Sequence, residues 1–118
     1  MPKYFLLISL FSLYSCGYFF GESREVKFEC YNAKLVEFAP PEGTFKCAIY
    51  LTEKCNNDSR LFILLRGKRY KELSVKKTGI IFNSDWYDHK LGLEFVPDPD
   101  QNSINNTDHL GVIVRFFY

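Results

Sequence analysis

Hydrophobic and polar residues alternate along much of the chain after residue 25. In segment 26–30, valine, phenylalanine and cysteine alternate with lysine and glutamate, and segment 45–52 repeats this pattern. A period of two is typical of β-strands that bury one face. No segment has a convincing helical period, and 18% of the residues are aromatic, which also favours strands. The pattern therefore predicts an all-β domain.

Turn-forming residues divide the chain into short strands. Strands are expected at 26–30, 33–38, 45–52, 61–65, 69–76, 80–82, 91–96 and 110–118. Segment 33–38 either extends the first strand through a bulge or forms a separate strand. The expected fold is a small antiparallel β-sandwich or partly open barrel of about seven strands.

Three local features of this fold can be read from residue types. Pro40-Pro41-Glu42-Gly43 predicts a turn, and hence a hairpin that joins 33–38 to 45–52. Segment 61–65 is apolar at every position, which predicts a strand buried on both faces. Residues 84–90 are expected to hold one helical turn, and 97–109 a long polar loop.

The first residues have the composition of a signal peptide. Lys3 is the only charged side chain in residues 1–21, and the apolar run 4–15 is interrupted only by serines. This run of about twelve residues is too short to cross the hydrocarbon core of a bilayer, which needs about 20. A short basic start followed by such a run predicts a removable leader.

The leader ends in Leu13-Tyr14-Ser15-Cys16-Gly17. These residues resemble the lipobox of bacterial lipoproteins, although Tyr14 is larger than the residue usual at its place. The resemblance implies cleavage before Cys16, a diacylglyceryl group on its sulfur and a fatty acyl group such as palmitate on its freed amine. Each buried methylene contributes about 0.8 kcal/mol, so two or three chains hold a domain on a membrane. The alternative is cleavage after Gly17, which gives a secreted protein.

The expected organisation is a signal peptide at 1–15, a lipidated N-terminus and tether at 16–25, and a single β domain at 26–118. If Cys16 is lipidated, three cysteines remain, enough for one disulfide; if it is not, four cysteines allow two bridges. The secretory context permits disulfides, and Cys47–Cys55 is a candidate pair that closes a short loop. The partner implied by the anchor is a lipid bilayer, at the outer membrane or cell surface.

Charge excludes one class of partner and leaves one candidate patch. The chain has 15 basic and 14 acidic side chains, and loss of Lys3 with the leader makes it neutral. Net charge therefore provides no attraction to nucleic acid, and none is expected as a partner. Basic residues cluster between 60 and 77, where the candidate patch for an acidic protein or polysaccharide ligand comprises Arg66, Lys68, Arg69 and Lys71. The favoured explanation is that lysines keep exposed strands from pairing with other molecules.

Asp85, Asp88 and His89 form the candidate catalytic group of a hydrolase, because a carboxylate can orient a histidine for proton transfer. Exposed polar residues beside a tryptophan are the favoured explanation, since no nucleophile or phosphate-loop motif accompanies them. Segment 98–102 begins like a calcium loop but lacks the required glycine and final glutamate. No metal or cofactor is expected. The sequence thus favours an anchored lipoprotein that binds or supports envelope or host components, then a secreted disulfide-bonded recognition module, then a hydrolase.

Overall fold

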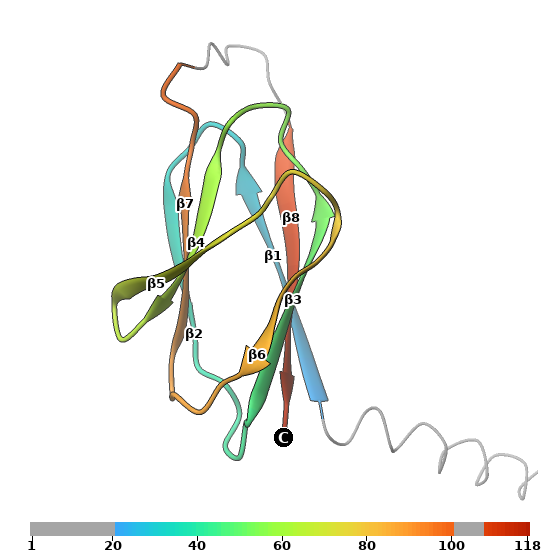
Figure 1. Cartoon of the computed structure of the whole chain (residues 1–118), viewed down its shortest axis with the longest axis vertical. Helices are drawn as coiled ribbons and strands as arrows, with labels where there is room; N and C mark the ends of the chain where they lie inside the picture. The colour runs from blue at the N-terminus through green and yellow to red at the C-terminus, as the bar shows by residue number, and fades with distance from the viewer. Residues whose placement is uncertain (1–20, 101–107) are drawn as a thin grey trace, which may run out of the picture.

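The computed structural model describes residues 21–100 and 108–118. These residues form eight strands and no helix: β1 (Gly21–Glu29), β2 (Lys34–Phe38), β3 (Lys46–Glu53), β4 (Arg60–Leu65), β5 (Lys68–Leu73), β6 (Gly79–Asp85), β7 (Leu91–Val96) and β8 (His109–Phe117). Two antiparallel four-stranded sheets result, with strand orders β1-β8-β3-β6 and β2-β7-β4-β5. The sheets pack face to face and do not close into a barrel (Figure 1). The expected all-β sandwich is confirmed, with eight strands instead of about seven.

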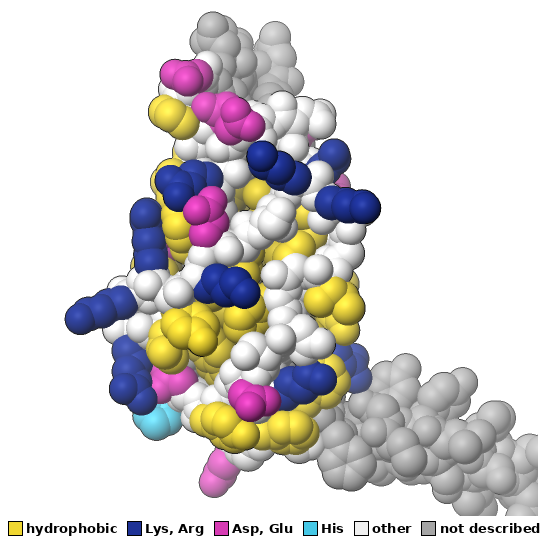
Figure 2. Space-filling view, in the orientation of Figure 1, with side chains coloured by type: hydrophobic (Ala, Val, Ile, Leu, Met, Phe, Trp, Pro, Cys, Tyr) yellow, Lys and Arg dark blue, Asp and Glu magenta, His cyan; other side chains and the backbone are white. Residues whose placement is uncertain are grey.

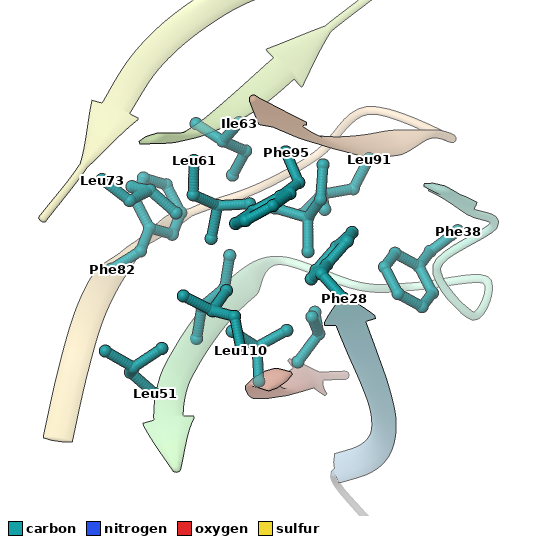
Figure 3. Packing of buried hydrophobic residues seen from close by; sticks show 14 of the residues in the cluster. Phe28, Phe38, Leu51, Leu61, Ile63, Leu73, Phe82, Leu91, Phe95 and Leu110 are labelled. Atoms are coloured by element: carbon teal, nitrogen blue, oxygen red, sulfur yellow. The ribbon is translucent and has the colours of Figure 1, made fainter. Parts of the chain in front are cut away.

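The core lies between the two sheets and is rich in phenylalanine (Figure 3). Phe28 of β1 and Phe95 of β7 stack with their ring centres 5.4 Å apart. Phe38 of β2 and Phe116 of β8 meet edge to face at 6.3 Å. Both pairs join opposite sheets, and each fully buried ring contributes roughly 1.5–3 kcal/mol. The alternation in the sequence is therefore explained by one inward face on each strand.

The hairpin predicted between 33–38 and 45–52 is wrong. β2 pairs with β7, whereas β3 pairs with β6 and β8. Residues 39–45 cross from one sheet to the other, so the Pro40-Pro41 turn connects layers instead of neighbouring strands. Alternation shows which face of a strand is buried, but it does not show which sheet the strand joins.

β4 and β5 are the only consecutive described strands that are neighbours in one sheet. Their hairpin turns at Arg66 and Gly67, which have φ angles of 55° and 78°. A two-residue turn with both residues in the left-handed region matches the twist of the strands that it joins. The turn between the strands expected at 61–65 and 69–76 therefore consists of Arg66 and Gly67, and β5 already begins at Lys68.

β4 is buried on both faces, as its apolar sequence predicts. Leu61 and Ile63 face the core and are fully buried. Phe62 lies on the opposite face, where the guanidinium carbons of Arg60 and Arg69 lie 4.8 and 4.0 Å from its ring centre. The second face is thus covered by arginine side chains and not by another layer of the fold.

Two further expectations about local structure are corrected. β1 begins at Gly21, which pairs with Phe117, so residues 21–25 belong to the sheet and not to a tether. Residues 84–90 form no helical turn, because β6 continues to Asp85 and a loop follows. The described residues contain no helix that is long and apolar enough to cross a membrane.

Candidate functional site

The expected lipidation site, Cys16, lies outside the described residues together with the rest of the leader. The described chain starts at Gly21, which pairs with Phe117 at the end of β8. The same end of the sandwich carries the ends of β2 and β6 and the starts of β3 and β7 (Figure 1). We call this end the lower pole, formed by loop 39–45, loop 86–90 and residues 117–118. The opposite end is called the upper pole.

The predicted Cys47–Cys55 pairing is wrong, because Cys30 forms the disulfide with Cys55. Cys47 lies near the start of β3 and Cys55 just beyond its end. An extended strand rises about 3.3 Å per residue, so eight residues hold these two cysteines far beyond the 7 Å limit for a bridge. Cys30 and Cys55 instead follow β1 and β3 at the upper pole, with Cα atoms 5.7 Å apart.

Cys47 is a free thiol in the core. Its side chain is fully buried between the sheets. Burial disfavours the thiolate and raises the pKa of Cys47 to about 12. The thiol is therefore inert toward metals and disulfide exchange at neutral pH.

The four residues of the candidate basic patch all lie on the β4–β5 hairpin and are exposed. Arg69 Nε donates to Glu94 Oε1 at 2.7 Å, and Arg66 Nε lies 3.4 Å from Asp88 Oδ1. Lys68 makes no ion pair with any residue that the structure describes, and the same holds for Lys71. Half of the patch is therefore neutralised by carboxylates.

Glu72 accepts two hydrogen bonds from Arg60, at 3.0 and 2.8 Å, on the same face of the sheet. The hydrogen bond from Arg60 lowers the pKa of Glu72, and the hydrogen bond from Arg69 lowers the pKa of Glu94. Each pair is a two-point contact between a guanidinium and a carboxylate. These pairs flank Phe62 and make this face of the hairpin mixed in charge.

A hollow of about 310 Å³ brings together residues that the sequence keeps apart. Its lining comes from the β4–β5 hairpin and from the loop after β6: Leu65, Arg66, Tyr70, Asp85, Trp86, Tyr87, Asp88 and His89. Tyr70 is 56% exposed and Tyr87 is 74% exposed, so two rings stand open to solvent around it. We call it the Tyr70–Tyr87 hollow. It contains the candidate catalytic group and one residue of the basic patch.

Trp86 connects the strands and loops that surround the Tyr70–Tyr87 hollow. Its ring meets Tyr70 and Phe82 edge to face, both at 6.2 Å, and closes the sandwich between β5 and β6. Its indole N–H donates to the carbonyl of Lys90 at 3.2 Å, and its backbone N–H donates to the carbonyl of Phe45 at 2.9 Å. Sequence reasoning treated Trp86 only as a neighbour of the polar residues, although its being the single tryptophan was a signal.

The residues of the candidate catalytic group differ in exposure and in their partners. Asp88 is only 12% exposed at its side chain and is engaged by Arg66. His89 is exposed and makes no hydrogen bond or ion pair with a described residue. His109 lies at the upper pole, where it starts β8. A general base needs a partner that orients it, whereas exposed rings beside a few polar groups suit reversible binding.

Of segment 98–102, residues 98–100 are described, and they form part of a turn. One carboxylate oxygen of Asp98 accepts a hydrogen bond from the backbone of Asp100 at 2.9 Å, and the other accepts one from Asp58 at 3.1 Å. Asn102 lies outside the described residues. Within residues 21–100 and 108–118, no three acidic, histidine or cysteine side chains are grouped to hold a metal ion.

Comparison of the chain with protein families, curated proteins and solved structures finds no match to any of them.

Proposed function

We propose that the protein is an extracytoplasmic lipoprotein, anchored through an acylated Cys16, whose β-sandwich serves as a binding or structural component of the outer membrane or cell surface. The Cys30–Cys55 disulfide is the observation that supports this best. Disulfides persist in oxidising compartments outside the cytosol and are common in small exported domains. The bridge therefore agrees with the leader that ends at Cys16.

The test is metabolic labelling with an alkyne fatty-acid analogue. We expect the wild-type protein to be labelled and Cys16→Ala to lose both the label and the membrane association. Cys47→Ala is the matched control, because it removes the other unpaired cysteine, and it should keep the label. The proposal fails if Cys16→Ala stays labelled, and a mature chain that starts at Tyr18 would support the secreted alternative instead.

The Tyr70–Tyr87 hollow supports a binding role for the domain. A small polar ligand, such as a unit of a polysaccharide, fits a site where aromatic rings offer apolar faces and Asp85 and Arg66 offer hydrogen bonds. Trp86 forms part of the lining, so its fluorescence reports on occupancy. We expect soluble saccharides to shift that fluorescence in the wild type and much less in Tyr87→Ala. Leu35→Ala, at an exposed residue of β2, is the control. If the wild-type protein hydrolyses the ligand and Asp85→Asn does not, the result would favour the hydrolase alternative.

A further inference from the structure

Hydrophobic side chains gather at the lower pole (Figure 2). Phe45 is 46% exposed and Tyr87 is 74% exposed, although both are large and apolar. Pro40 and Pro41 line a hollow of about 320 Å³ with Tyr87, and Glu42, Asp88 and His89 contribute polar groups to the same hollow. Phe45 and Tyr87 are two of the five exposed large hydrophobic residues among the described ones, and they share this end of the domain. Exposed apolar side chains that lie on one surface mark a candidate contact site.

Hydrogen bonds connect the loops of the lower pole to each other and to β8. The backbone N–H of Phe45 donates to the carbonyl of Phe117 at 2.9 Å, and the carbonyl of Phe45 accepts from Trp86 at 2.9 Å. Thr44 closes the turn before it, because its backbone N–H and its hydroxyl both donate to the carbonyl of Pro41, at 3.1 and 2.6 Å. The loops that carry the exposed rings are therefore tied to each other and to β8.

Cations stand beside the rings at the same end. Lys46 Nζ and the guanidinium carbon of Arg115 each lie 5.3 Å from the centre of the Phe117 ring. Aromatic rings with nearby Lys and Arg side chains are typical of protein surfaces at the boundary between lipid headgroups and acyl chains. The pairing of ring and cation suits a phosphate-bearing surface better than a purely apolar partner.

The start of β1 decides which end of the domain lies near an anchor at Cys16. Only five peptide steps separate Cys16 from Gly21, and they span at most about 18 Å. Gly21 lies at the lower pole, where it pairs with Phe117. The upper pole is one length of β8 away, and nine residues of strand make about 30 Å. An acylated Cys16 therefore brings the lower pole, and not the upper pole, to the lipid headgroups.

We infer that the lower pole is a membrane-contact surface, and that Phe45 and Tyr87 insert into the headgroup region of the bilayer that holds the anchor. This inference rests on the proposed acylation of Cys16. It adds an orientation: the sheets extend away from the membrane, and the upper pole, with the Cys30–Cys55 disulfide, points outward. The Tyr70–Tyr87 hollow then opens close to the headgroups.

The experiment uses the mature acylated protein in vesicles of phosphatidylethanolamine and phosphatidylglycerol. Acylation is first measured by mass, and vesicle flotation shows that the protein is anchored. Hydrogen exchange is then compared between vesicles and a non-ionic detergent, together with quenching of Trp86 by brominated lipid. We expect loops 39–45 and 86–90 to be protected in vesicles about tenfold more than in detergent, and the Trp86 fluorescence to fall in brominated vesicles.

Two double variants provide the comparison. Phe45→Ser with Tyr87→Ser should remove the protection and the quenching, while the protein stays acylated and still floats with the vesicles. Leu35→Ser with Ile80→Ser changes two equally exposed residues that lie away from the lower pole, and it should behave as wild type. Equal thermal unfolding midpoints show that neither pair disturbs the fold.

The possible outcomes distinguish failure of the membrane contact from failure of the proposed acylation. An acylated, floating wild-type protein without protection at the lower pole overturns the membrane contact and leaves the proposed function standing. A mature protein without an acyl group at Cys16 overturns both. Protection that rises with protein concentration in the absence of vesicles identifies a second copy as the occupant and also overturns the membrane contact.

Discussion

The guanidinium of Arg69 lies 4.0 Å from the centre of the Phe62 ring while it donates to Glu94 at 2.7 Å. Arg60 covers the same ring from 4.8 Å and holds Glu72. The ring faces away from the core, yet it is only 6% exposed. Basic side chains on β4 and β5 thus act first as a cover for an apolar strand, through cation–π contact and their aliphatic stems.

This cover makes Phe62 a stability determinant. Phe62→Ala removes a buried ring, and we expect it to lower the free energy of unfolding by about 3 kcal/mol. Urea denaturation measures the change. Leu35→Ala removes a side chain that is 59% exposed, and it should change the free energy by no more than about 0.5 kcal/mol. Similar effects of both substitutions would contradict the burial of Phe62 beneath the arginines.

The hairpin is not expected to bind polyanions through its lysines. Arg66 and Arg69 already face Asp88 and Glu94, and residues 16–118 carry equal numbers of basic and acidic side chains. We expect Lys68→Gln with Lys71→Gln to leave the retention on heparin unchanged at physiological salt. Clearly weaker retention of this variant than of wild type would establish the basic patch as a polysaccharide site.

Low pH is expected to weaken the contribution that Glu72 and Glu94 make to the stability of the fold. The pKa of Glu72 and the pKa of Glu94 are both lowered in the folded protein by hydrogen bonds from Arg60 and Arg69. Such groups stabilise the fold at a pH above their ordinary value of 4.5, and the stabilisation is lost as the pH falls through the folded pKa. The urea midpoint of wild type should therefore approach that of Glu72→Gln with Glu94→Gln below pH 4.5. A difference that persists unchanged into acid would contradict the pKa shifts.

The Cys30–Cys55 bridge is expected to stabilise the domain by about 3 kcal/mol, because it closes a sequence separation of 25 residues. In urea denaturation, the double variant Cys30→Ala with Cys55→Ala should have a free energy of unfolding that is lower by this amount. Reduction of the wild-type protein should have the same effect, which serves as the control for the substitutions. Cys30 and Cys55 are buried, so the reductant is applied in urea. A urea midpoint that is the same with and without reductant would refute the pairing.

Cys47 should react with a thiol reagent only when the domain unfolds. Its side chain is fully buried, and burial raises its pKa to about 12, so almost no thiolate exists at neutral pH. We expect labelling by an aromatic disulfide reagent to follow the unfolding curve in urea. Under native conditions, fast labelling that Cys47→Ala abolishes would contradict the placement in the core.

Sequence reasoning succeeded where the information was local. Alternation located most strand ends to within about three residues, although β1 begins earlier, at Gly21. The unbroken apolar run 61–65 correctly indicated a strand buried on both faces. It failed where two distant segments had to be matched. The polar residues 85–89 were recognised as a group, but their encounter with Arg66 and Tyr70 across the hollow was not.

The sequence by itself determined an all-β chain, the inward face of several strands and the position of most turns. A residue's neighbours along the chain set these properties, because side chains of a strand alternate between its two faces. Only the tertiary structure decided that β2 pairs with β7, that Cys30 bonds to Cys55, and that the start of β1 and the exposed rings of the lower pole share one end. Those relationships join residues far apart in sequence, and packing of the whole core selects them, since any single strand would fit several partners equally well.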